Sequence, residues 1–221
     1  MLYNAQQVKD NIRNRDGKRV FYLGKADQLT SEARDYLTRE RIEILPGHAA
    51  KQERYRLLGG GYMEEKPEHM THLNAEILVE KTHPRIVFRG NVDLLEAELL
   101  LALGQLPQWS GELGQVLALA RKLISCDVLD QPVPETELGG LDEGMLRKRS
   151  HFPQEFYNQP HFMPQPTDKQ QILLLNRLRS LTRQTEISAV AAFPERKDII
   201  RALNRMSSFL YILMLREKGK G

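Results

Sequence analysis

The sequence of 221 residues predicts an all-α protein, an antiparallel bundle of four or five helices with a small N-terminal αβ extension. Two observations support this fold class. Long apolar segments with helical spacing dominate the chain from residue 71 onward, and short strand patterns are confined to the residues before it. We therefore expect two parts, an αβ unit with a linker at residues 1–70 and a helical bundle at residues 71–221.

The N-terminal part has the pattern of a small strand, helix and strand unit. Residues 18–23 (KRVFYL) predict a short strand. Thr30 is a good cap for a following helix, whose first turn carries Glu32 and which should end near residues 39–41. The chain then returns as a second strand (RIEIL), and residues 46–70, rich in glycine, charge and proline, predict a loop or linker.

Four long helices are expected in the second part. In residues 111–129, apolar side chains such as Leu113, Val116 and Leu117 recur at helical spacing, so one stripe should face a core. Residues 130–168 hold six of the eleven prolines and should be mostly irregular, which makes them a candidate functional segment. The expected helices are residues 84–106, 111–129, 168–193 and 195–219.

Composition excludes several classes of protein. The single cysteine, Cys126, rules out a disulfide framework and a multi-cysteine metal site, and it agrees with a reducing cytoplasm. The 32 basic and 29 acidic residues, a net charge of +3, are too balanced to require a nucleic acid partner. No apolar run reaches the roughly 20 residues that span a bilayer, and the first residues predict no signal peptide. We expect a soluble protein with no membrane partner.

Polar side chains form columns on helices that are otherwise apolar. Such columns are usually solvated faces or a buried ion-pair network that holds a bundle in register. Alternatively, two guanidinium groups one turn apart form a fork for phosphate oxygens, and a nearby acid can hold one of them in place. The three columns are Arg179, Arg183 and Glu186; Asn204, Ser207 or Ser208, and Tyr211; and Asp93 with Glu96.

Several of these residues occur in an ordered set of motifs. Residues 79–106 (VEKTHPRIVFRGNVDLLEAELLLALGQL) carry Lys81 and Arg85 before a helix start with Gly90 and Asp93. Together with the arginine column and the segment LNRMSS, this set resembles the PduO-type ATP:cob(I)alamin adenosyltransferases. Further runs, namely THL at residues 71–73, GLDE with a later SH, and the ending LNRMSS, are more similar to the ethanolamine-utilisation (EutT) branch of these enzymes.

The resemblance implies a reaction and a set of site residues. In this family Co(I) of a reduced corrinoid attacks the 5′ carbon of ATP, and triphosphate leaves, with Mg²⁺ bridging phosphates. Such a displacement needs a cationic cradle and accurate placement, and no nucleophilic side chain. The implied residues are Arg183, Arg179 and Asp93 for catalysis, Thr71, His72, Lys81, Arg183, Glu186 and Asn204 for ATP, and Asp93, His161 and Phe162 for cobalamin.

The chain departs from the family pattern at the position of the corrinoid-facing aromatic residue. Family members are thought to displace the lower axial ligand of cobalt with a phenylalanine before a proline. Alignment on Pro164 puts His161 at that position with Phe162 beside it. Phe162 is therefore the candidate apolar wedge or a core anchor of the loop. His161 is a candidate cobalt ligand or a structural histidine.

Two further departures concern phosphate and metal binding. The glycine-rich phosphate loop of the PduO type is missing, and Thr71 and His72 stand about where it would begin. The three glycines at 59–61 are a substitute or merely a flexible link. A histidine and cysteine metal motif of many EutT-type proteins is reduced to His48, with Gly60, Gly61 and Glu64 in place of the thiolates. We therefore expect no iron or zinc bound by protein cysteines.

The resemblance also implies partners and a location. It implies a homotrimer with sites between subunits, a cytoplasmic protein with an association with a bacterial microcompartment left open, and a flavoprotein reductase and an adenosylcobalamin-dependent lyase as candidate partners. Two other classes remain open. One is a non-catalytic scaffold or docking protein of an ethanolamine-metabolising compartment. The other is a basic nucleic acid binder, favoured only by the positive charge and the tail REKGKG.

Overall fold

The computed structural model describes residues 1–15, 17–47 and 55–220. By its contacts the chain divides into two compact units, Met1–His83 and Pro84–Gly221. The predicted boundary lies near residue 70, whereas strands up to residue 80 belong to the first unit.

The first unit is built on β-sheet, so the prediction that the chain is all-α is wrong. Among the described residues, one sheet has seven strands in the order β5-β3-β2-β7-β6-β9-β8, and a second, parallel sheet joins β1 to β4. The strands are β1 (Leu2–Tyr3), β2 (Arg13–Arg15), β3 (Lys18–Leu23), β4 (Gln28–Leu29), β5 (Glu43–Pro46), β6 (Tyr55–Leu57), β7 (Tyr62–Met63), β8 (Met70–His72) and β9 (Ile77–Glu80).

Strands β6 to β9 lie where a linker and the start of the helical region were expected. Strand β6 pairs with β7 in antiparallel fashion and with β9 in parallel, with Leu57 opposite Leu78. The β8–β9 hairpin places Thr71 opposite Val79. These strands are two to four residues long. Two to four residues are too few for alternation of apolar and polar side chains to indicate a strand. The conformation of these segments is decided by pairing with strands that are remote in the sequence.

The predicted strand and helix near the N-terminus are confirmed. Strand β3 pairs in parallel with β5, with Val20 opposite Glu43. Helix α2 (Ser31–Arg39) follows Thr30, whose hydroxyl accepts the Ala33 N–H at 3.2 Å. A second helix, α1 (Ala5–Asp10), was not expected; it has a capping box between Asn4 and Gln7. The two helices pack on a small core that includes Val8, Phe21 and Leu37.

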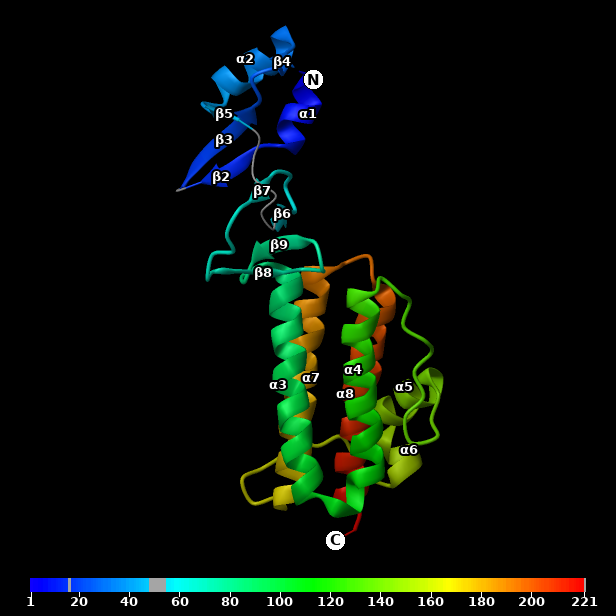
Figure 1. The fold of residues 1–221 in the computed structure, drawn as a ribbon. Helices are drawn as coiled ribbons and strands as arrows, with labels where there is room; N and C mark the ends of the chain where they lie inside the picture. Colours follow the sequence, from blue (N-terminus) through cyan, green and yellow to red (C-terminus); the bar gives the residue numbers. More distant parts are fainter. Residues whose placement is uncertain (16, 48–54, 221) are drawn as a thin grey trace. The chain divides into compact units, whose positions relative to one another are not determined.

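The second unit contains the four expected long helices. Figure 1 shows them side by side, with α3 antiparallel to both α4 and α7, and α7 antiparallel to α8. Each begins and ends within a few residues of its predicted bounds. They are α3 (Pro84–Gln105), α4 (Ser110–Val128), α7 (Gln170–Ala192) and α8 (Lys197–Lys218).

Helix α8 is the most buried of the four. From Met206 to Leu215 only Ser208 and Tyr211 are not fully buried. A helix that is apolar all round belongs in the middle of a core, where it contacts several neighbours. The core around it also takes side chains from α3, such as Phe88 and Leu95, and from α4, such as Leu113. The buried polar groups on α8, such as Ser207, are thereby held at a fixed position.

The segment 130–168 is less irregular than expected. It contains helices α5 (Glu143–His151) and α6 (Pro153–Tyr157). Asp142 caps α5, because its side chain accepts the Met145 N–H at 2.7 Å. Figure 1 shows both helices beside α8. The many prolines concealed these helices, although Pro153 occupies the first position of α6, where proline is well tolerated.

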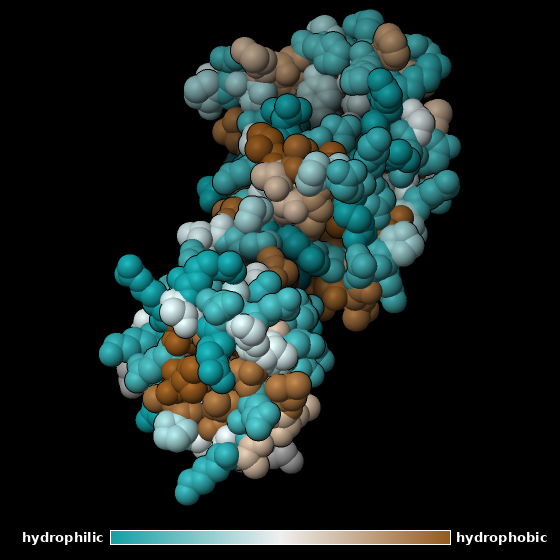
Figure 2. All heavy atoms as spheres, turned by 90° about the horizontal axis from the view of Figure 1, so that it is seen from above, coloured by the Kyte–Doolittle hydropathy of each residue, from teal (hydrophilic) through white to brown (hydrophobic). Residues whose placement is uncertain are grey.

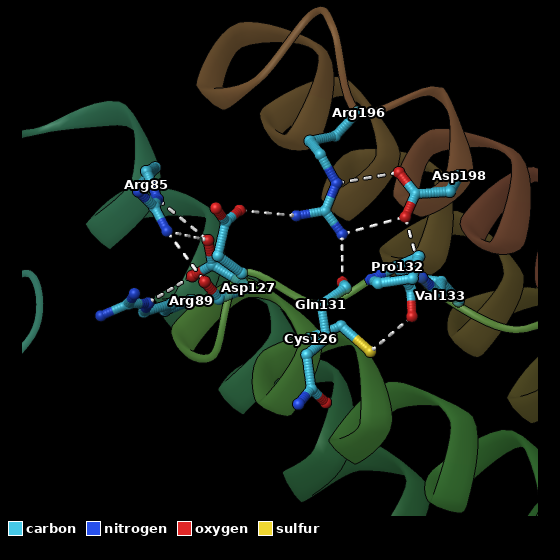
Figure 3. Close-up of polar contacts among 10 residues, drawn as sticks. Arg85, Arg89, Cys126, Asp127, Gln131, Pro132, Val133, Arg196 and Asp198 are labelled. Carbon is cyan, nitrogen blue, oxygen red and sulfur yellow. Dashed lines mark hydrogen bonds and ion pairs between the residues drawn. The ribbon is translucent and has the colours of Figure 1, made fainter.

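A network of charges links the ends of three helices (Figure 3). Asp127 on α4 is fully buried and accepts hydrogen bonds from Arg85 Nη2 at 2.6 Å and from Arg89 Nε at 2.7 Å, both on α3. Nearby, Arg196 donates to the Gln131 carbonyl oxygen at 2.7 Å and pairs with Asp198 at 2.9 Å. The contacts of Asp127 fasten the start of α3 to the end of α4. The contacts of Arg196 and Asp198 fasten the loop after α4 to the start of α8.

Asp198 makes the folded state sensitive to acid. The hydrogen bond from Arg196 is the main reason why the pKa of Asp198 lies well below its ordinary value of 3.8, and the Val133 N–H adds to the effect. A lowered pKa stabilises the fold above the unfolded-state pKa, and this contribution is lost as the pH falls. We expect the stability difference between wild type and Asp198→Asn, measured by urea unfolding, to shrink below about pH 4. A difference that stays constant down to about pH 2.5 would contradict this assignment.

The end of α8 is held by the only tryptophan of the sequence. Trp109 lies in the 3₁₀ turn η1 (Pro107–Trp109) and donates its indole N–H to the buried Glu217 at 2.9 Å. Arg216 and Lys220 lie over the indole ring, at 4.8 and 4.0 Å from its centroid. The indole therefore joins the α3–α4 connection to the last turn of α8.

Gly139 permits a close approach between a turn and α8. It has a φ of +60°, and an added Cβ would lie 2.7 Å from the Phe209 ring. Gly139→Ala should therefore lower the free energy of unfolding by about 2 to 4 kcal/mol, through overpacking and left-handed strain. Gly140→Ala is the matched control, since φ is +71° there and an added Cβ would have no heavy atom of a described, non-adjacent residue within 4 Å. Chemical denaturation should give the larger loss for Gly139→Ala, and equal losses would refute the steric explanation.

The surface combines a hydrophilic background with apolar patches. The face drawn in Figure 2 is mostly hydrophilic, and its apolar residues gather in separate patches. Exposed apolar side chains in the second unit include Val87, Leu94 and Leu101 on α3 and Ile187 on α7. None of the helices in the described parts of the chain has the length and apolar character needed to cross a membrane.

Candidate functional site

A cavity of about 430 Å³ opens in the second unit. Its walls come from the end of α5, from α7 and α8, and from the loop that precedes α7. Most of the residues that line it are polar, although α8 is otherwise apolar. They are Ser150, His151, His161, Phe162, Met163, Arg179, Arg183, Asn204, Ser207, Ser208 and Tyr211.

Two arginines from consecutive turns of α7 line this cavity. Arg179 is half-buried and donates from Nε and Nη2 to Asn176 Oδ1 at 3.2 and 3.1 Å. Burial and the neighbouring charge of Arg183 lower the pKa of Arg179. Arg183 is exposed and forms no ion pair with any residue in the described ranges. Among the described residues neither arginine forms an ion pair, so the two adjacent cations provide a positive potential suited to an anion.

Two further predicted site residues, Asn204 and Glu186, are joined by a hydrogen bond. Asn204 on α8 donates from Nδ2 to Glu186 Oε1 on α7 at 3.0 Å. Asn204 lines the cavity, and Glu186 lies one turn beyond Arg183 on α7. The Ser207 hydroxyl donates to the Asn204 carbonyl oxygen at 2.9 Å. The polar column on α8 therefore lies at the cavity, where it contacts α7 through Asn204.

The loop before α7 brings His161 and Phe162 to the same cavity. His161 Nδ1 lies 3.2 Å from the Tyr211 hydroxyl, and its Nε2 lies 3.0 Å from the His151 carbonyl oxygen. The Phe162 ring is half-buried and stacks on the Tyr211 ring at a centroid distance of 6.0 Å. Residues from α5, α8 and the loop thus meet at one wall of the cavity.

The remaining predicted site residues lie elsewhere. Thr71 and His72 form part of β8, and Lys81 is an exposed residue just after β9, so all three belong to the first unit. Asp93 is exposed on α3 and does not line the cavity. Their roles toward ATP and cobalamin remain predictions. His48, the remnant of the histidine and cysteine motif, lies outside the described residues.

Sequence reasoning missed part of this site. Ser150 and His151 were noted only as part of a motif, and they reach the cavity because α5, which was not expected, ends there. Tyr211 was placed in a polar column without a role. Its position four residues after Ser207 on a buried helix was the available signal, because a hydroxyl in an apolar face needs a partner.

The comparisons with known proteins identify related sequences. The family model for cobalamin adenosyltransferase matches residues 61–217. The corrinoid adenosyltransferase EutT of Salmonella typhimurium is 31% identical over 163 residues, 71% of this chain and 61% of that protein. The EutT of Escherichia coli is 31% identical over 158 residues, 68% of this chain and 59% of that protein. The chain therefore spans about three fifths of the length of these relatives.

Solved structures with a similar fold are also known. Two single-residue variants of a PduO-type ATP:corrinoid adenosyltransferase from Lactobacillus reuteri, each complexed with cobalamin and ATP, align with TM-scores of 0.55 and 0.53. Their sequence identities are 16% and 17%, and the matches cover 69% of this chain and 88% and 91% of those chains. On the extent of the family match and the identity to its curated relatives, the chain belongs to the cobalamin adenosyltransferase family.

Proposed function

We propose that the protein transfers the 5′-deoxyadenosyl group of ATP to the cobalt of cob(I)alamin and releases triphosphate. The observation that carries the proposal is the pair Arg179 and Arg183, which lines one polar cavity together with Asn204 in a member of this family. In the step, the Co(I) electron pair attacks the 5′ carbon of ATP. The cobalt–carbon bond forms as the bond between that carbon and the triphosphate oxygen breaks, and the electron pair leaves with the triphosphate.

The arrangement of charges suits this displacement. The leaving triphosphate carries about four negative charges, so preorganised cations lower the barrier most where that charge develops. Arg183 is free to contact phosphate, and Arg179 is kept in place by its bonds to Asn176. Positioning of the 5′ carbon near cobalt can contribute roughly 7 to 11 kcal/mol to catalysis. Neither task requires a nucleophilic side chain.

A magnesium ion would fit next to these arginines. Carboxylate oxygens are preferred Mg²⁺ ligands, and the ion is commonly held by one or two carboxylates plus substrate phosphates. Glu186 offers such a carboxylate, with Oε1 oriented by Asn204 at 3.0 Å. When bound, the ion would neutralise phosphate charge. We propose that Lys81, Thr71 and His72 provide further phosphate contacts, as the family resemblance implies.

We also propose that the protein is a homotrimer. Val87, Leu94 and Leu101 recur every seven residues on α3 and are 44%, 44% and 60% exposed, so they form one apolar stripe. Asp93 adjoins this stripe and is available to pair with Arg179 of a neighbouring subunit. An apolar stripe of this kind is typical of a surface that is covered by another chain. Sedimentation equilibrium should give the mass of three chains, and a monomer would refute this part of the proposal.

The activity is tested with chemically reduced cobalamin and ATP under anaerobic conditions, in the presence of a chelator for transition metals and an excess of Mg²⁺. We expect the absorption spectrum of adenosylcobalamin to develop with time and triphosphate to be released in equal amount. ATP titration provides the second measurement. A protein that neither binds ATP nor forms the product is better described as a non-catalytic scaffold.

A further inference from the structure

The side chain of Tyr211 contacts two residues of the loop before α7, His161 and Phe162. Its hydroxyl lies 3.2 Å from His161 Nδ1 and accepts the Phe162 N–H at 3.3 Å. Its ring stacks on the His161 ring at 5.9 Å with an interplanar angle of 11°, and on the Phe162 ring at 6.0 Å with an angle of 28°. One residue of the rigid helix α8 therefore fixes both aromatic residues of the loop.

The hydrogen bonds also indicate which ring nitrogen of His161 carries the proton. Its Nε2 lies 3.0 Å from the His151 carbonyl oxygen, which can only accept, so Nε2 carries the proton. In the neutral ring, Nδ1 is then the acceptor, and the Tyr211 hydroxyl donates to it. Both nitrogens are engaged within the chain, and neither has a lone pair available for a metal ion. His161 is therefore a structural support in this geometry.

A second contact fixes the far end of the loop to the same helix. Lys218, seven residues after Tyr211, pairs with Asp168 at 2.9 Å, and its ammonium group lies 4.6 Å from the centroid of the Phe162 ring. Asp168 also accepts the Gln165 N–H at 2.7 Å, which closes the turn. Phe162 is thus held by contacts with Tyr211 and Lys218, both on α8.

From these contacts we infer that Tyr211 is a positioning residue for the corrinoid. It keeps His161 hydrogen-bonded within the loop wall, so that His161 does not bind cobalt. Phe162 is then the aromatic side chain that faces the corrin ring. This inference rests on the proposed function and deepens it, because it decides between the two residues that the sequence left as candidates. Tyr211 acts through the loop and has no chemical role in the displacement.

The first test compares Tyr211→Phe with Tyr157→Phe. The former keeps the stacked ring and removes both hydrogen bonds of the hydroxyl. The latter is a matched control, because the Tyr157 hydroxyl is buried and has no hydrogen-bond partner among the described residues. We expect Tyr211→Phe to lower kcat about tenfold, because the loop that carries Phe162 loses both hydrogen bonds to the hydroxyl. KM for ATP should be unchanged. Tyr157→Phe should match wild type in both constants.

The second test asks whether a histidine binds cobalt. Electron paramagnetic resonance of Co(II)alamin bound with ATP is recorded for wild-type protein with ¹⁴N-histidine and with ¹⁵N-histidine. We expect identical spectra. A change of the nitrogen splitting from a triplet to a doublet would mean that a protein histidine is a cobalt ligand, and it would overturn the inference.

The outcomes separate the inference from the proposed function. If wild-type protein forms adenosylcobalamin and Tyr211→Phe has the same kcat as Tyr157→Phe, the positioning role is wrong and the proposed function stands. If wild-type protein forms no adenosylcobalamin at all, the proposed function is wrong and the inference fails with it. Thermal melting of both variants verifies that each is folded.

Discussion

Arg183→Ala should lower kcat/KM by about 10² to 10³-fold and remove most of the affinity for ATP. The guanidinium lines the cavity and has no internal ion pair in the described parts of the chain, so it is free to contact the triphosphate. A preorganised donor at a developing negative charge typically contributes a factor of this size. Because Arg183 is exposed, its removal should leave the fold intact. Isothermal titration with ATP and the anaerobic assay measure the two effects.

The matched control for this experiment lies on the same helix. Arg177 is also on α7, is 62% exposed and pairs with Glu98 at 2.6 Å outside the cavity. An exposed ion pair of this kind contributes about 0 to 1 kcal/mol to stability, and Arg177→Ala should keep wild-type activity. Equal activity of the two variants would mean that Arg183 does not bind the triphosphate.

Asp127→Asn should destabilise the second unit by about 3 to 5 kcal/mol. The carboxylate is fully buried and holds Arg85 and Arg89 with bonds of 2.6 and 2.7 Å (Figure 3). Replacement by the amide keeps the shape but removes the negative charge that compensates two partly buried guanidinium groups. Such one-sided removal is far more costly than the absence of the whole network. Urea unfolding followed by circular dichroism measures the loss.

An aspartate three positions later provides the control. Asp130 is 94% exposed and lies 3.6 Å from Arg196. Its φ of +50° is tolerated by asparagine, so Asp130→Asn changes only the charge. We expect a loss of at most about 1 kcal/mol for Asp130→Asn. If Asp127→Asn were equally mild, the network would have no structural importance.

The long helices could be predicted because their periodicity is a local property. Apolar side chains repeat over five or six turns in α3, α4, α7 and α8, and each helix began and ended close to its predicted bounds. The same periodicity placed Arg179 and Arg183 on one face, and the structure brings both to one cavity. Residues separated by one helical turn remain neighbours whatever the rest of the fold does.

Features that depend on remote pairing could not be predicted in the same way. Strands β6 and β9 are short, and they are stabilised by pairing between residues far apart in the chain, such as Leu57 and Leu78. The contact between Tyr211 and the loop joins a periodic helix to a segment without periodicity. Asp127 offered a detectable signal, because it continues the apolar stripe of α4 one turn after Leu123. A charge in such a stripe requires partners, and these are Arg85 and Arg89.

The indole of Trp109 gives the protein a built-in fluorophore. As the sole tryptophan, it is the one indole that emits. Two cationic side chains, Arg216 and Lys220, lie over its ring, and its N–H is bonded to Glu217. Any displacement of the last turn of α8 changes the charges around the ring, and with them the wavelength and intensity of the emission. Ligand titrations and stopped-flow mixing can therefore follow the motion of this helix without an added label.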